Sequence, residues 1–322
     1  MKIANINNKI YNIHNISNES LKKNVENSSF CGRFDSSINK KFLKNNIKIV
    51  FSDIDGTISE HSDLMTPKTI NAVNFLHKKG VPVVLTTARC FQDTLPIIDQ
   101  FLHKPDYTIA LQGGELVNGI GASIFKNVIS QKTGEKLINW FKTIGKKDPN
   151  SHLIMYFDEQ PYAVSNIQFP WKAKSLIKQV NSFNELFREK RTLQKALIYK
   201  SNALKESDYC QDTIINSFNS SKVPDLKINP SSQSVLEFQN NWVSKDKAID
   251  FLLRALKINP KNAMVIGDSS NDVEMMDFIR QRGGLSVAMG NANEKVKEHA
   301  NLITSSVTQD GFSNIISKIF SL

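Results

Sequence analysis

Short apolar runs of strand length alternate with segments of helical spacing, and this alternation constrains the fold more than any other feature of the sequence. The runs at 47–52 and 81–85 are largely apolar, as buried parallel strands are. Between them, Thr66 suits a helix N-cap and Pro67 suits the first helical position. Strands and helices in this order predict an α/β fold, with a parallel sheet that carries helices on both faces.

The same alternation returns in the last third of the chain, whereas the middle differs. Predicted helices lie at 91–102, 245–256, 271–279, 293–299 and 311–320, and predicted strands at 107–111, 263–267 and 285–289. The middle predicts helices at 133–144 and 207–218, and strands at 153–157, 194–199, 226–228 and 235–238. We therefore expect a core in two parts, 46–129 and 237–322, with an α+β domain inserted at 130–236.

Residues 1–45 differ in composition from the rest of the chain. They are rich in asparagine, lysine and serine, with isoleucines at irregular spacing, and they predict a disordered N-terminal extension. No continuous apolar stretch follows Met1, so a signal peptide is not supported. No run approaches the ~18 apolar residues of a membrane-spanning helix, and we expect no membrane partner.

Charge and cysteine content narrow the class of protein further. The formal net charge is +10, but residues 1–48 hold nine basic against three acidic residues, and the remainder is close to neutral. A nucleic-acid site would therefore lie mainly in the tail, and no nucleic-acid partner is expected. Cys31, Cys90 and Cys210 are widely spaced, which disfavours a disulfide framework or a zinc site and suits the cytoplasm. The oligomeric state is left open.

Two aspartates follow the first predicted strand. Asp53 and Asp55 flank Ile54, and in an extended segment residues two apart point the same way. Adjacent carboxylates at the carboxyl edge of a parallel sheet, where such folds bind ligands, repel each other unless a cation or a proton intervenes. The alternative is a solvated Asx turn.

A second acidic pair, Asp268 and Asp272, follows the predicted strand at 263–267. Two acidic strand ends in one sheet can converge on Mg²⁺, which prefers carboxylate, water and phosphate oxygens. The alternative is a helix N-cap at Asp268 or Asn271. Hydroxyl groups at 86–87 and the lysine at 245 could bind a phosphoryl group, although Lys245 could equally be a solvated residue at a helix start.

The motif order resembles that of the haloacid-dehalogenase-like superfamily. DxDGT at 53–57, a threonine after the second strand, Lys245 and GDxxND at 267–272 occur in the expected order. The runs at 267–276 and 287–291 are similar to those of its Cof-type branch. The resemblance implies a Rossmann-like core and makes 130–236 a type-II α/β cap, in which Trp171, Lys172, Lys174 and Arg188 are either pocket or surface residues. The chain departs from the pattern at Ala88 and at 112–114.

The resemblance also implies an activity, a cofactor and a set of site residues. The activity would be hydrolysis of phosphate monoesters of small metabolites, such as sugar phosphates or cofactor monophosphates, with Mg²⁺ and an aspartyl-phosphate intermediate. The implied site residues are the nucleophile and metal ligand Asp53, the general acid/base Asp55 with its main-chain oxygen on the metal, the phosphate-binding Thr87 and Lys245, the metal ligand Asp268, the orienting Asn271, and Asp272, which holds the metal's water shell.

Two other interpretations remain. One is a sugar-phosphate phosphatase or phosphomutase dedicated to a single pathway, and the other is a non-catalytic protein that binds phosphorylated metabolites on the same scaffold. The complete acidic set argues against the second. Turnover of p-nitrophenyl phosphate with Mg²⁺ separates an enzyme from a binding protein.

Overall fold

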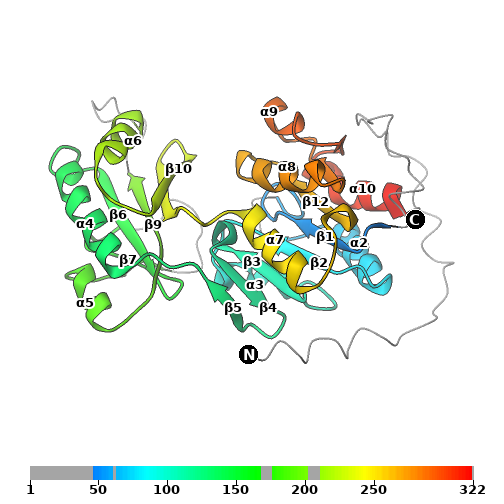
Figure 1. Cartoon of the computed structure of the whole chain (residues 1–322), viewed down its shortest axis with the longest axis horizontal. Coiled ribbons are helices and arrows are strands. Elements are labelled where there is room, and N and C mark those ends of the chain that lie inside the picture. Colours follow the sequence, from blue (N-terminus) through cyan, green and yellow to red (C-terminus); the bar gives the residue numbers. More distant parts are fainter. Residues whose placement is uncertain (1–45, 61–62, 168–175, 202–210, 321–322) are drawn as a thin grey trace. The chain divides into compact units, whose positions relative to one another are not determined.

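The computed structural model describes residues 46–60, 63–167, 176–201 and 211–320 (Figure 1). The expected disorder of residues 1–45 concerns a segment outside these ranges. The chain divides into two compact units. The first comprises Met1–Leu85, Ile97–Asp106 and Leu253–Leu322, and the second comprises Thr86–Pro96 and Tyr107–Leu252. The boundaries expected for an inserted cap, 130 and 236, stay a prediction.

The first unit is built on parallel strands. Their order is β14-β13-β12-β1-β2, and the bounds are β1 (Ile49–Ser52), β2 (Val83–Thr86), β12 (Ala263–Gly267), β13 (Leu285–Ala288) and β14 (Leu302–Ile303). Every residue of β1, β2, β12 and β13 is buried, as the continuous apolar runs predict. The expected α/β fold with a sheet rich in parallel strands is confirmed.

The helices of the first unit have the expected signals at their ends. Helix α2 (Pro67–Lys78) begins after Thr66, whose side chain accepts a hydrogen bond from the Thr69 N–H. Helix α10 (Gly311–Phe320) packs against α2, while α8 (Val273–Gln281) packs against β12 and β13. Helix α9 (Glu294–Lys297) is shorter than predicted, and α3 (Phe91–Ile98) ends four residues earlier than predicted.

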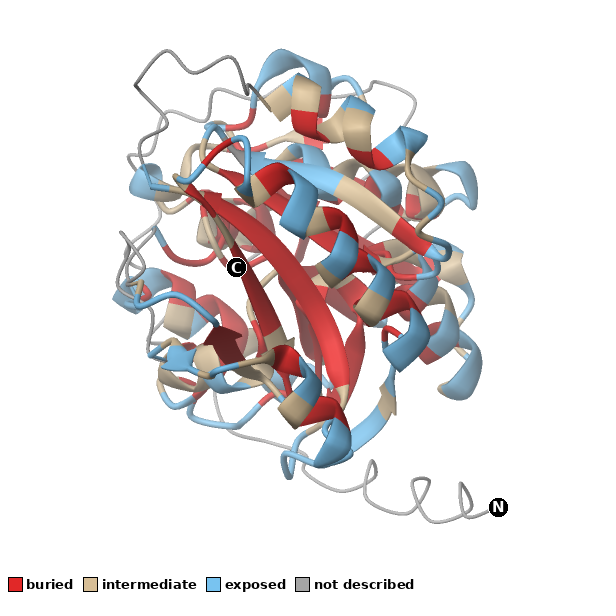
Figure 2. Ribbon diagram, turned by 90° about the vertical axis from the view of Figure 1, so that its left-hand side faces the viewer, coloured by how far each residue is buried: buried red, intermediate tan, exposed pale blue. Residues whose placement is uncertain are grey.

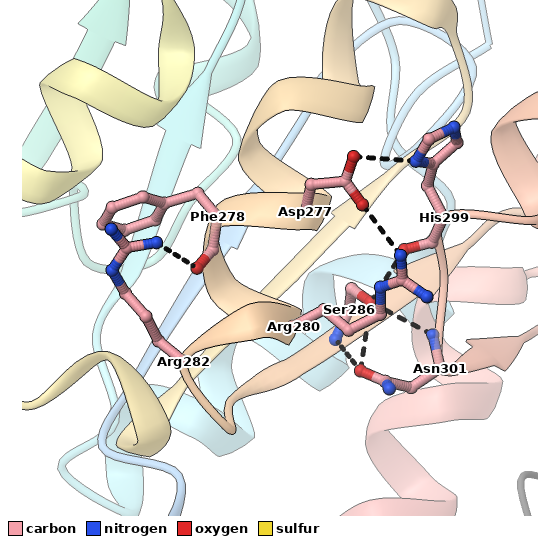
Figure 3. A network of polar contacts seen from close by, with 7 residues as sticks. All are labelled: Asp277, Phe278, Arg280, Arg282, Ser286, His299 and Asn301. Atoms are coloured by element: carbon pink, nitrogen blue, oxygen red, sulfur yellow. Dashed lines mark hydrogen bonds and ion pairs between the residues drawn. The ribbon is translucent and has the colours of Figure 1, made fainter.

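A polar network ties α8 to the segment that precedes β14 (Figure 3). Asp277 accepts from His299 Nδ1 at 2.8 Å and pairs with Arg280 at 3.0 Å. Ser286 on β13 bonds Asn301 through both its backbone and its side chain. Burial opposes ionisation of Asp277, but the bonds from His299 and Arg280 outweigh it and lower the pKa of its carboxyl group.

The second unit contains two assemblies of strands, in which every pair but one is antiparallel. The first consists of β3 (Tyr107–Ala110), β4 (Glu115–Asn118) and β5 (Ser123–Lys126). The second is a six-stranded sheet in the order β10-β11-β9-β6-β7-β8, with bounds β6 (Ser151–Phe157), β7 (Gln160–Ala163), β8 (Lys178–Gln179), β9 (Leu193–Lys200), β10 (Leu226–Ser232) and β11 (Val235–Asn240). The sequence pattern did not predict strands β4, β5 and β7.

One face of the six-stranded sheet is covered by helices. Helices α4 (Gln131–Gly145), α5 (Phe183–Arg188) and α6 (Gln211–Ser220) contribute Leu137, Phe187 and Phe218 to a core shared with the strands. Trp140, Phe218 and Phe238 form an aromatic cluster with centroid separations of 4.9–5.7 Å. In Figure 2 the strands are mostly buried while the helices present exposed outer faces. Helix α7 (Lys245–Ala255) begins in this unit, which ends at Leu252 within the helix.

No helix within the described ranges combines the length and apolar character that crossing a bilayer requires.

Candidate active site

Asp53 is held at the carboxyl end of β1 by the backbone ladder. Its N–H donates to the Ile266 carbonyl of β12 at 2.9 Å, which extends the parallel pairing of Ser52 with Ile266 by one bond. The side chain is 5% exposed. Two neighbouring strands of distant sequence therefore end together, with Asp53 on one and the segment of Asp268 on the other.

Three carboxylates gather at this edge. Asp53, Asp268 and Asp272 each offer an oxygen, and these oxygens all lie within 4.8 Å of one another. Asp272 is fully buried, and its Oδ2 accepts from the N–H groups of Asp268 at 3.0 Å and Ser269 at 3.1 Å. These bonds hold the loop between β12 and α8 in place.

The Asp268 carboxylate is oriented by three groups. Gly56 has a φ of +81°, and a Cβ at that position would overlap Oδ2 of Asp268. Asn291 donates through Nδ2 to Oδ2 of Asp268 and to the Gly56 carbonyl, both at 3.0 Å. Thr57 Oγ1 lies 3.5 Å from the other carboxylate oxygen. Asn291 was not among the predicted site residues, although it follows β13 and so lies at the same kind of strand end.

Asp55 and Asn271 lie on the two loops that carry the cluster. Asp55 is half-buried in a tight turn in which the N–H groups of Thr57, Ile58 and Ser59 all donate to the Ile54 carbonyl. Asn271 is exposed in the short 3₁₀ turn before α8 and accepts from Ser269 Oγ. The structure thus brings together Asp53, Asp268 and Asp272, and gives Asp55 and Asn271 positions on adjoining loops.

The donor set of the cluster fits a hard divalent cation. All three groups are carboxylates, two of them buried, and such charges this close repel one another unless a cation or proton intervenes. Carboxylate oxygens in this number, with positions open to water and phosphate, suit Mg²⁺ better than metals that prefer sulfur or imidazole.

Thr87 lies in the second unit and follows β2. It is fully buried, its N–H donates to the Ile109 carbonyl, and its hydroxyl accepts from the Arg89 N–H at 3.1 Å. The N–H of Gln112 donates to the Thr87 carbonyl at 2.8 Å. The loops after β2 and β3 are therefore joined around Thr87.

Lys245 begins α7 in the same unit and is only 1% exposed. A lysine is almost never so buried without an anionic partner, so the solvated-lysine alternative is wrong. The loop after β3 reaches this helix start: Gly113 has a φ of +94°, and a Cβ there would overlap the Ser244 carbonyl. Thr87 and Lys245 are thus linked through the loop at 112–113.

The other candidate residues come from the segment expected to be the cap. Trp171, Lys172 and Lys174 fall outside the described residues, and Arg188 is exposed at the end of α5. Cys90 is a buried free thiol that donates to Asp93.

Comparison with known proteins agrees with the motif order. The sequence profile described as haloacid dehalogenase-like hydrolase matches residues 50–316. A 5-amino-6-(5-phospho-D-ribitylamino)uracil phosphatase of Bacillus subtilis is 26% identical over 275 residues, covering 84% of this chain and 94% of the relative. A solved Thermotoga maritima structure has a TM-score of 0.72 at 22% identity, covering 84% of this chain and 97% of its own. A sugar phosphatase has a TM-score of 0.66 at 22% identity, with coverages of 85% and 99%.

Proposed function

Because the chain belongs to the haloacid dehalogenase-like hydrolases, we propose that it is a Mg²⁺-dependent phosphatase that cleaves phosphate monoesters of small metabolites through an aspartyl-phosphate intermediate. The observation that carries the proposal is the convergence of Asp53, Asp268 and Asp272 at the ends of two adjacent strands. The named phosphatases among its relatives support the reaction class.

Asp53, Asp268 and the main-chain oxygen of Asp55 would hold the Mg²⁺, with Asp272 supporting its water shell. When bound, the ion offsets negative charge on the phosphoryl oxygens. Asp272 also has a purely structural task, because its bonds to the N–H groups of Asp268 and Ser269 keep the loop in place. Asn271 would orient the phosphate from the exposed side of that loop.

Asp53 is the group proposed to attack phosphorus. Its carboxylate forms a bond to phosphorus while the ester oxygen leaves, which divides hydrolysis into two easier steps. Asp55 would protonate the leaving oxygen and then take a proton from the water that hydrolyses the aspartyl phosphate. The hydrogen bond from the Asp53 N–H to the Ile266 carbonyl limits the movement of the proposed nucleophile before the substrate binds.

Thr87 and Lys245 would bind the transferring phosphoryl group. A buried ammonium offsets charge on phosphoryl oxygens more strongly than an exposed one, because less water screens it. The loop at 112–113 connects both residues, so displacement of one would disturb the other.

Sugar phosphates and cofactor monophosphates are the proposed substrates, in the cytoplasm. A relative that acts on a phosphorylated ribityl compound and a neighbour named as a sugar phosphatase support this choice. A phosphatase or mutase dedicated to one pathway is the closest alternative. A mutase would have to shield the aspartyl phosphate from water.

The test is phosphate release by the full chain from p-nitrophenyl phosphate and from a panel of phosphorylated metabolites, with Mg²⁺ and with EDTA. We expect release that requires Mg²⁺ and that Asp53→Asn abolishes without a change in thermal stability. Binding of phosphorylated metabolites without turnover across the panel would instead establish a non-catalytic protein. Asp53→Asn activity above about a tenth of wild type would remove Asp53 as the nucleophile, given the size of nucleophile effects.

A further inference from the structure

The parallel strands of the first unit begin at one edge of their sheet and end at the edge that carries the acidic cluster. Strands β13, β12, β1 and β2 are adjacent in this order and run the same way, so the segments that precede them all lie at the edge where the strands begin. We call these segments the basic edge, and they comprise residues 280–284, 254–262, 46–48 and 78–82. None of the four segments contains an acidic residue.

Backbone contacts hold the four segments side by side. The N–H group of Lys48 donates to the Asn262 carbonyl at 2.7 Å, and the N–H group of the second residue of β1 donates to the Pro82 carbonyl at 3.0 Å. A Cβ on Gly284 would overlap the Pro260 carbonyl, so the segments before β12 and β13 touch as well. Neighbouring strands lie about 4.8 Å apart, and the basic edge is therefore a row about 14 Å long.

The cations of the basic edge are exposed. Those that pair with no acidic side chain of the described residues are Lys48, Lys78, Lys79, Lys257, Lys261 and Arg282. The negative end of a helix dipole favours a nearby cation, which accounts for Lys78 in the last turn of α2. Lys48 precedes a strand, so a helix end does not account for it. The edge therefore has more positive charge than its helix ends explain.

Acidic side chains flank the basic edge. Asp277 lies beside the segment before β13 and pairs with Arg280 at 3.0 Å. On the side of β2, Asp106 acts electrostatically on His77, which directly precedes Lys78. Between these flanks the exposed cations of the row face solvent.

The near-neutral charge of residues 49–322 conceals a separation of charge within the first unit. The cations precede the strands, whereas the acidic cluster follows them. From Lys48 to Asp53 the chain rises by five residues of strand, which places the two edges about 16 Å apart. Our expectation of no nucleic-acid partner came from the total charge, which does not reveal such clustering.

The basic N-terminal extension joins the chain at this same edge. Residues 1–45 lie outside the described ranges, and their sequence holds eight lysines and arginines against three acidic residues. The description begins at Asn46, whose carbonyl accepts from Nδ2 of Asn262 at 2.7 Å. The extension is therefore attached beside the basic edge, and its charge adds to the positive field there.

Arg282 offers a flat surface in addition to its charge. Its guanidinium group lies over the Phe278 ring, 4.1 Å from the ring centre, and donates to the Phe278 carbonyl at 3.1 Å (Figure 3). An exposed guanidinium plane held in this way can stack on an unpaired base. Within the four segments, all of which the structure describes, no large apolar side chain is exposed. The basic edge therefore lacks the apolar anchors that binding to a membrane surface uses.

We propose that the basic edge binds single-stranded RNA, with its lysines on the phosphates and Arg282 stacked on a base. At about 3.4 Å per nucleotide of a stacked strand, the row of about 14 Å spans about four phosphates. The strand is single because a base within a duplex is not free to stack on a side chain. This binding is separate from the proposed hydrolysis of phosphate monoesters, whose acidic cluster lies at the opposite edge of the sheet.

The test is the fluorescence anisotropy of a labelled, unstructured RNA of about 15 nucleotides, titrated with the full chain at several KCl concentrations. We expect a Kd of about 1–100 µM near physiological salt. The triple variant Lys48→Gln/Lys78→Gln/Lys261→Gln should bind at least about tenfold more weakly at low salt. The slope of log K against log salt should also fall by about 2, because each lost contact with a phosphate of a single strand removes about 0.7.

A second variant separates stacking from charge. Arg282→Lys keeps the positive charge but removes the planar group, so we expect binding at least about threefold weaker with an unchanged salt slope. The matched control is Lys132→Gln/Lys136→Gln/Lys222→Gln, which removes the same charge at exposed positions of the second unit. It should match wild type in both affinity and slope. Thermal melting of every variant establishes that it is folded.

Four outcomes would overturn the proposal. The first is wild-type affinity in the triple variant, which would place any RNA binding in the N-terminal extension alone. The second is an equal loss in the control, which would show that only the total charge matters. The third is tighter binding to a duplex RNA of the same length. The last is absence of RNA binding while the protein binds vesicles of phosphatidylcholine with about 30% phosphatidylserine, which would identify a membrane surface instead.

Discussion

The carboxylate of Asp268 lies against the Cα of Gly56, so closely that a Cβ on residue 56 would overlap it. The two residues come from different strand ends, and the glycine is needed twice, for its φ of +81° and for this approach. The turn at the end of β1 therefore fixes where the Asp268 carboxylate can be.

Gly56→Ala should displace Asp268 and lower kcat/KM by about 100-fold, the size of effect expected when a catalytic group moves by about 1 Å. The measurement is kcat/KM at several Mg²⁺ concentrations, together with thermal stability. Gly80→Ala is the control, because Gly80 has a similar φ of +70° but open space around its Cβ position. Equal activity of the two variants would show that backbone strain alone is responsible.

Asp55→Asn should slow both proton transfers and reduce kcat by about 10²–10⁴-fold, the usual contribution of a general acid/base. Because hydrolysis of the aspartyl phosphate also needs this base in the proposed mechanism, phosphorylated enzyme should accumulate, detectable by mass spectrometry after acid quenching. Asp63→Asn, at an exposed position, serves as control. A wild-type rate for Asp55→Asn would contradict the assignment.

Asp272 contributes both a negative charge and hydrogen bonds that hold its loop. Substitution by asparagine or by alanine distinguishes the effect of the charge from that of the hydrogen bonds. Asp272→Asn can still accept from the Asp268 and Ser269 N–H groups, so we expect unchanged melting but about tenfold more Mg²⁺ needed for half-maximal activity. Asp272→Ala should in addition lose about 1 kcal/mol of stability with the cap. An unchanged Mg²⁺ requirement in Asp272→Asn would leave this residue with a structural role only.

The network of Asp277, His299 and Arg280 predicts a pH dependence of stability. Because the folded-state pKa of Asp277 is lowered, its stabilisation is fully present above the unfolded pKa of about 3.9 and is lost as the pH falls through the folded value. Asp277→Asn should cost at most about 1 kcal/mol at pH 7, since the pair is partly solvated.

The check is the melting temperature between pH 3 and pH 7. Wild type should lose more stability than Asp277→Asn toward the acidic end, so that the two curves converge there. Glu274→Gln, an exposed position on the same helix, should follow wild type at every pH. Parallel curves for wild type and Asp277→Asn would contradict the prediction.

The sequence predicted the strands that carry the acidic residues because parallel strands buried on both faces leave continuous apolar runs. The prediction for 263–267 matches β12 residue for residue, and that for 311–320 matches α10. Helix 271–279 begins instead as a 3₁₀ turn, since Asp272 bonds back to the loop.

The sequence pattern did not predict the elements whose burial depends on residues far away in the sequence. Strand β4 begins with Glu115, which is 1% exposed and paired with Lys126 and Gln194, and no local pattern reveals a buried glutamate. Its neighbour β5 is largely exposed, so it lacks an apolar run. Asn291 was missed for a related reason: a single amide carries no periodic signal, and only the fold brings it to Asp268.

Strands β1 and β12 are far apart in the sequence, so they can pair only late in the synthesis of the chain. Thr57 and Asp268, which meet at the acidic cluster, are 211 positions apart. A ribosome-bound chain can form the turn after β1 early, yet the acidic cluster stays incomplete until the strand at 263–267 and the loop after it have emerged. If the proposed function holds, nascent or prematurely terminated chains would lack phosphatase activity.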